Sequence, residues 1–253
     1  MKEASRTTHK LELGRTASDR AAMIYAVDVG STLNGRKGVA FAWAKVPLSG
    51  GQPNTSIDPV ELANSVASDL SSGGSVALGL EAPLFIPVPA DVTRLSRGRE
   101  NEGDRSWAAP AGGYVAALAL HQAAWLLARI RAECSKCKCS EFELSVDPAR
   151  WLSDKGAKPV LFCWEAFVSG EAHKDHRRDA ATAAMYFQAH QAELITAVTA
   201  ENPLSLFGCA VLWSGWSTDL TLLHRSLLVL RPDLPWIGEL GVAPAFVQPD
   251  AAQ

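Results

Sequence analysis

The sequence has no excess of positive charge and no long apolar run, and each absence excludes a class of protein. Its 253 residues carry 24 Lys and Arg against 27 Asp and Glu, which gives a formal net charge of −3 and a pI near 6.1. Such a chain has no global attraction for nucleic acid, so contact with DNA or RNA would depend on a local patch or on metal ions. No unbroken apolar run approaches the roughly 20 residues of a membrane span, so we expect no membrane segment.

Cysteine is scarce, with five residues, an odd number. Three of them, Cys134, Cys137 and Cys139, lie within six residues, but a structural zinc site takes four ligands. No second CxxC or HxxxH pair accompanies them, although Cys163 or Cys209 could fold back to complete a site. We interpret the cluster as an exposed loop with incidental thiols, and we expect no disulfides in a reducing compartment.

The beginning of the sequence is polar and lacks the apolar core of a secretory signal. We therefore expect a disordered tail over residues 1–20, a single domain over 21–243, a second tail over 244–253 and a cytoplasmic location. The hydrophobic share of 47% and the charged share of 20% are typical of a globular protein with a sizeable core. The sequence does not predict the oligomeric state.

The first chemical signal is an acid at the end of an apolar run. Residues 23–27 are apolar and lead to Asp28, which is followed by Gly30, Ser31 and Thr32. A second apolar run over 39–46 predicts a β-hairpin. Asp is a poor strand residue, and a charge at a buried strand end needs a partner such as a metal ion or a phosphate site. The alternative, that Asp28 only caps the turn, is about equally favoured.

A second acid occupies the corresponding place after the next predicted strand. Residues 57–70 have helical spacing, and residues 75–80 form a short apolar run that ends in Glu81 and Pro83. Ligands of open α/β sheets bind outside the carboxyl ends of the parallel strands. Glu81 is therefore a candidate ligand, with a helix cap or an ion pair as the alternative.

The connection over residues 85–111 contains four arginines and four acids. Its arginines Arg94, Arg97, Arg99 and Arg105 could hold phosphates, because guanidinium groups match them. The acids nearly cancel this charge, and a solvated mobile loop is favoured. A long helix follows, apolar nearly all round until Arg129 and therefore predicted to be buried, in which we interpret His121 as a core histidine.

The rest of the chain supplies a third acidic position. Residues 142–146 predict a strand, which Asp147 ends as a helix cap, and residues 159–168 predict a short apolar helix. Asp175, His176 and Asp179 then open a helix rich in alanine. Residues three and four apart share a helix face, so His176 and Asp179 can point together; plain capping is the alternative.

Asp28, Glu81 and Asp179 are hard oxygen ligands of the kind that Mg²⁺ and Mn²⁺ prefer. Two such ions activate water and stabilise the leaving oxygen of a phosphodiester. The sequence therefore predicts metal-dependent phosphodiester hydrolysis, with nucleic acid as the partner through local contacts only.

The segments AVDVGS…KGVAFAW, GLEAPL and HRRDAATAA resemble motifs of the ribonuclease H-like superfamily. The order is similar to that of resolvases of RuvC type, in which Asp-x-Gly-Ser opens a hairpin and a strand-end Glu follows. In those resolvases His-x-x-Asp-Ala or Asp-x-x-Asp-Ala begins the last helix, and this chain has the His form. The middle of the chain also resembles predicted ribonuclease H-like nucleases, a family of unknown function, in which an acid-x-Pro-Leu strand end leads to an Arg-rich loop. The resemblance covers residues 23–195.

The resemblance implies an α/β fold with a mixed five-stranded sheet, antiparallel through the first hairpin and parallel beyond it, flanked by helices. It implies a nuclease in which the metal ligands are Asp28, Glu81 and Asp179, His176 is a ligand or general base, and Asp175 is a further acid of the metal site. We assign substrate contacts to Ser31, Thr32, Arg94, Arg97 and Arg177. The chain departs from these patterns in two ways. It lacks the net positive charge of a protein that binds DNA junctions, and it has Glu81 where the family of unknown function more often has Asp.

Two other functions remain open. An actin-like or sugar-kinase-type ATPase shares the fold and an Asp-x-Gly phosphate loop, but it needs two such domains. A binding module without catalytic activity would use the same acids as caps and ion pairs. DNA and RNA, and endo- and exonuclease action, are not distinguished.

Overall fold

Short apolar runs of the sequence form the strands of one mixed sheet in the computed structural model, which describes residues 22–33, 40–103, 106–137, 141–153, 158–168 and 175–232. The predicted tails over 1–20 and 244–253 lie outside the described residues. So do Cys139 and Arg105.

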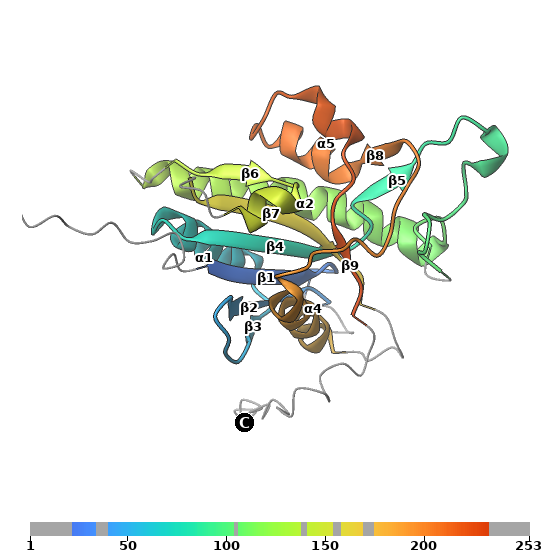
Figure 1. The fold of residues 1–253 in the computed structure, drawn as a ribbon. Helices are drawn as coiled ribbons and strands as arrows, with labels where there is room; N and C mark the ends of the chain where they lie inside the picture. The colour runs from blue at the N-terminus through green and yellow to red at the C-terminus, as the bar shows by residue number, and fades with distance from the viewer. Residues whose placement is uncertain are drawn as a thin grey trace, which may run out of the picture.

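The described residues form a seven-stranded sheet (Figure 1). Its order is β3-β2-β1-β4-β7-β6, with β9 also paired to β7. β1 pairs antiparallel with β2, which is the predicted hairpin, and β2 pairs antiparallel with β3. The remaining pairings, β1 with β4, β4 with β7, and β7 with β6 and β9, are parallel. The predicted mixed α/β sheet is confirmed, but the predicted number of five strands is wrong. The strands are β1 (Ala22–Asp28), β2 (Ala42–Pro47), β3 (Asn54–Ser56), β4 (Ser75–Glu81), β6 (Glu143–Ser145), β7 (Val160–Ala166) and β9 (Val229–Leu230).

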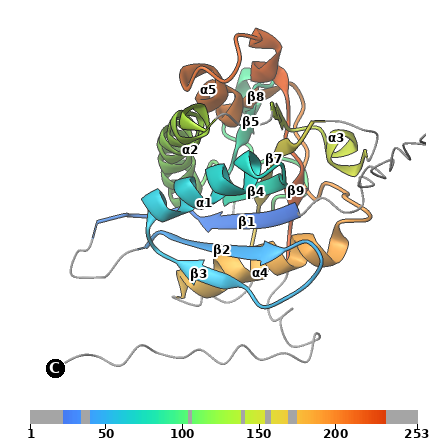
Figure 2. The same ribbon diagram turned by 90° about the vertical axis from the view of Figure 1, so that its left-hand side faces the viewer.

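Helices cover both faces of this sheet (Figure 2). One core cluster joins the sheet to α1 and α2, and a second cluster joins the opposite face to α4. The strands β5 (Phe85–Pro87) and β8 (Pro203–Ser205) form a separate antiparallel pair. The helices are α1 (Pro59–Ser71), η2 (Val92–Arg94), α2 (Pro110–Lys136), α3 (Pro148–Leu152), α4 (His176–His190), α5 (Leu206–Trp213) and η3 (Leu220–His224).

The strand β7 corrects the helix predicted over residues 159–168. All seven of its residues are buried, because the strand lies between β4 and the β6/β9 edge with helices on both faces. A fully buried strand has no alternation of apolar and polar residues, and a run of seven fits a strand better than a helix. On the α4 face, an added Cβ at Gly79 would overlap the indole of Trp164, so only glycine allows these strands to pack in this way.

The helix α2 is less buried than predicted. Seven of its residues are buried, while Tyr114 is 64% exposed and His121 lies at the surface, which corrects the interpretation of His121 as a core histidine. Among the described residues, α2 alone is long and apolar enough to cross a membrane by length and composition, although no unbroken apolar run reaches that length. One such helix is weak evidence for a membrane span, and a soluble protein is compatible with the fold.

Candidate functional site

Two of the predicted acids are neighbours at one end of the sheet. Asp28 ends β1 and Glu81 ends β4, and the two residues are paired in the parallel register. Side chains alternate between the faces of a strand. Ile24, Ala26 and Ala77 face the α4 side, so Asp28 and Glu81 point to that side as well. Both acids therefore lie on the same face, at the carboxyl ends of adjacent strands.

The start of α4 brings the other predicted residues to this end of the sheet. Asp175 is its N-cap and accepts hydrogen bonds from the backbone N–H groups of Arg177 and Arg178. His176 follows at the first helical position, and its Nδ1 lies 2.6 Å from Oδ2 of Asp28. The small buried residues over 180–184 let the helix lie close to the strands, as predicted.

Asp28 is held in a site that disfavours its charge. Its side chain is 12% exposed, against 40% for His176. Burial raises the pKa of Asp28 to about 6, the hydrogen bond and charge of His176 oppose the rise, and the charge of Asp179 adds to it. Asp179 is thus close enough to Asp28 for their charges to interact. A cation at this place would offset the repulsion between the two carboxylates.

Four more of the predicted site residues, Ser31, Thr32, Arg94 and Arg97, lie in the loop after β1 and in the connection after β5. Ser31 and Thr32 are exposed; the Ser31 hydroxyl accepts the N–H of Leu33. Arg94 pairs with Glu201 at 3.4 Å. It lies, like Arg97, in the segment between β5 and α2, which projects beyond the body of the fold (Figure 1).

Two more predicted residues lie at the start of α4. Arg177 is exposed there, next to His176. Asp175 is exposed and acts as a cap, which is the alternative that the sequence left open.

The acids at this end of the sheet suit a divalent metal ion by their chemistry but not by their spacing. Within the described part of the chain, no three His, Cys, Asp or Glu side chains lie closely enough to hold one, and this includes the described cysteines. Cys134 is buried in α2 and Cys137 is exposed at its C-terminal end, so the exposed loop predicted for this cluster is wrong at Cys134. The donor chemistry does fit, because Asp28, Glu81 and Asp179 offer the carboxylate oxygens that Mg²⁺ and Mn²⁺ take. The side chains as described therefore provide suitable donors without a completed ligand shell.

A buried charge cluster at the same end of the sheet was missed by the sequence interpretation. Both oxygens of Glu165 bind the Arg99 guanidinium, at 2.6 and 2.7 Å, and its Oε2 also accepts the N–H of Leu84. Arg99 also binds Glu102 and lies over the ring of Phe85. The side chains of Arg99, Glu102 and Glu165 are each 1% exposed.

This Arg99 cluster, defined as Arg99, Glu102 and Glu165, shows that part of the connection over 85–111 is fixed to the sheet. The predicted solvated loop is wrong for this part. Burial raises the pKa of Glu165, and the bound guanidinium opposes that rise. A cavity of about 350 Å³ lies beside the cluster and is also lined by Glu81. The signal in the sequence was Glu165 itself, a single acid inside an apolar run, which requires a buried partner.

Comparison with known proteins does not assign the chain to a family. No protein-family model, no curated protein and no solved structure matches it. Any function proposed for this site therefore rests on the residues of this chain alone.

Proposed function

We propose that the chain is a divalent-metal-dependent nuclease of ribonuclease H-like type, which hydrolyses phosphodiester bonds of DNA or RNA. The observation that carries this proposal is the register pairing of Asp28 with Glu81, with the His176 end of α4 bound to Asp28. The order of the elements agrees with it: an acid after the first hairpin strand, an acid after the next parallel strand and an acid in the first turn of a late helix.

The metal ions would be held by Asp28, Glu81 and Asp179. When bound, Mg²⁺ or Mn²⁺ activates water and stabilises the negative charge of the leaving oxygen. Asp28 has two carboxylate oxygens, and the bond to His176 uses Oδ2, so Oδ1 is the oxygen that would bind a metal ion. Asp175 supports the site by fixing the start of α4.

His176 has the geometry of a general base. Its Nδ1 lies 2.6 Å from the Asp28 carboxylate, which favours the tautomer with the proton on Nδ1. The lone pair of the neutral ring is then on Nε2, and the 40% exposed side chain can present this atom to a water molecule. The carboxylate fixes the ring orientation and stabilises the imidazolium that forms when the proton is accepted. Arg177, exposed on the next position of α4, is placed to contact the phosphate backbone.

A binding module without catalytic activity is the second candidate. It is favoured by the absence of a three-donor cluster among the described residues and by the use of Asp28 as a hydrogen-bond partner of His176. In that case the acids position α4 on the sheet, and no reaction depends on a divalent ion.

Hydrolysis assays separate the two candidates. We expect Mn²⁺-dependent cleavage of labelled single- or double-stranded DNA or RNA, and a loss of at least about 100-fold in rate in His176→Ala, as for other general bases. Glu81→Gln and Asp179→Asn are expected to lose the activity.

The matched control is Asp147→Asn, since Asp147 caps α3 after the edge strand β6 and Asn caps a helix equally well. It should keep full activity. Cleavage that persists in Glu81→Gln and Asp179→Asn, or no cleavage of any substrate, would contradict the proposal. Saturable ATP binding by an inactive protein would favour the ATPase instead.

A further inference from the structure

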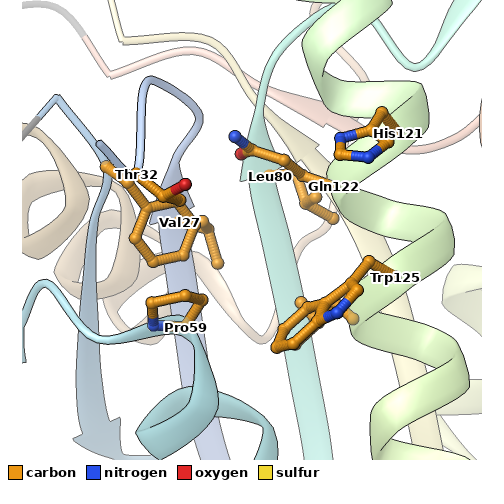
Figure 3. A pocket seen from close by; sticks show the side chains of 9 residues that line it. Val27, Thr32, Pro59, Leu80, His121, Gln122 and Trp125 are labelled. Carbon is orange, nitrogen blue, oxygen red and sulfur yellow. The ribbon is translucent and has the colours of Figure 1, made fainter.

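A second cavity lies on the face of the sheet opposite Asp28 and Glu81. It has a volume of about 240 Å³, and Figure 3 shows it between the strand ends and α2. Its inner wall includes Val27 and Leu80, which are register partners and directly precede the two acids. Pro59 from α1, Thr32 after β1 and Trp125 from α2 line it as well.

Gln122 gives this largely apolar cavity a polar atom, its Oε1, that has no hydrogen-bond partner among the described residues. Its Nε2 donates to the carbonyl of Gly30 at 2.6 Å, which fixes the orientation of the amide. Its Oε1 is buried and accepts no hydrogen bond from any of the described residues. Figure 3 shows the amide between the two walls of the cavity. A buried acceptor without a donor is unfavourable, so a bound molecule with an N–H group would gain affinity by donating to it.

The size and walls of the cavity restrict the kind of molecule that fits. A dry cavity of about 150 Å³ accepts benzene, so this one has room for a fused two-ring system. Trp125, which is 39% exposed, and Phe41 supply aromatic faces against which a flat ring packs favourably. His121 lies exposed on the same helix and adds a polar group to the lining.

We infer that this cavity is a binding site for a planar two-ring heteroaromatic molecule that carries an N–H donor, the class of purine bases and indoles. The ring lies against Trp125 and Phe41, and its N–H donates to Oε1 of Gln122. The inference is independent of the proposed nuclease activity, because it uses neither the acids nor a metal ion.

The test compares indole with benzofuran, a ring system of the same shape that has oxygen in place of the N–H group. Binding is measured by ligand-observed NMR titration of the full chain, with adenine as a third probe. Indole is expected to bind about tenfold more tightly than benzofuran, since only indole satisfies the buried acceptor. In Gln122→Leu this preference is expected to disappear, and in Trp125→Ala both ligands are expected to bind at least about fivefold more weakly.

Trp213→Ala is the control, because Trp213 is 73% exposed on α5 and lies outside the lining. It should leave both affinities unchanged, and thermal melts of all variants verify folding. If the parent protein binds adenine and Gln122→Leu does not, the ligand is a purine base. If the parent binds indole but not adenine, the ligand is an aromatic molecule of the indole class. Equal affinities for indole and benzofuran, no binding by any probe, or a preference that survives Gln122→Leu would overturn the inference.

Discussion

Replacing Arg99 with methionine is expected to lower the free energy of unfolding by about 3 to 5 kcal/mol, the usual cost of breaking a buried ion pair from one side. The substitution leaves the Glu102 and Glu165 carboxylates, each 1% exposed, without their cation. Methionine preserves much of the apolar volume over Phe85, so the loss reports charge and hydrogen bonding more than packing. Chemical denaturation at neutral pH measures it.

The pH dependence gives this prediction a second readout. In the variant, burial still raises the pKa of Glu165, but the guanidinium that opposes the rise is gone. Glu165 then takes up a proton as the pH falls, and the stability deficit should shrink below neutral pH. Arg94→Met is the control in the same connection, since its exposed pair with Glu201 should contribute less than about 1 kcal/mol. Equal losses in the two variants would contradict the assignment of the Arg99 cluster as a structural anchor.

Asp28→Asn is expected to stabilise the metal-free protein at neutral pH. The folded structure raises the pKa of Asp28 from 3.8 to about 6. Stability from the protonated carboxyl is therefore fully present below about pH 4 and is lost as the pH rises through about 6. Asparagine has no charge to bury and keeps an acceptor for His176. At about 1.36 kcal/mol per pKa unit, the variant should be more stable than the parent by up to about 3 kcal/mol above pH 7.

Denaturation with EDTA present, at several pH values between 4 and 8, measures the difference between Asp28→Asn and the parent protein. It should be near zero at pH 4 and reach its plateau near pH 7. Glu193→Gln is the control, because Glu193 is exposed and its loss should change stability by less than about 0.5 kcal/mol at every pH. A variant less stable than the parent at pH 7, or a stability difference independent of pH, would show that burial does not raise the pKa of Asp28.

Local sequence pattern predicted much of the fold. Seven features form where apolar spacing and capping residues indicate: the β1–β2 hairpin, α1, β4, α2, β6, α4 and the cap at Asp147. The pattern failed at β7, where burial on both faces removes the alternation that marks a strand. It also missed β3, β5, β8 and β9, which have two or three residues each and gain their conformation from pairing with neighbours.

The candidate site was predictable only in part. Asp28 and Glu81 could be found because acids at strand ends are unusual, and the parallel register that pairs them follows from the fold. The bond from His176 to Asp28 depends on how α4 packs across the sheet, which no local pattern determines. Arg99 and Glu165 are 66 residues apart, so no local pattern predicts their pairing. Nothing in the sequence distinguishes Arg99 from the other arginines of the connection over 85–111.

A calorimetric Mn²⁺ titration of nucleotide-free protein, beside Asp28→Asn and Asp147→Asn, tests the central claim most directly. We expect saturable binding by the parent and by Asp147→Asn, and binding at least about tenfold weaker in Asp28→Asn, which loses a carboxylate ligand. The denaturation series proposed for Asp28→Asn checks that this variant is folded, so that a loss of binding reports the site itself. Identical weak binding by all three proteins would contradict a metal centre at the ends of β1 and β4.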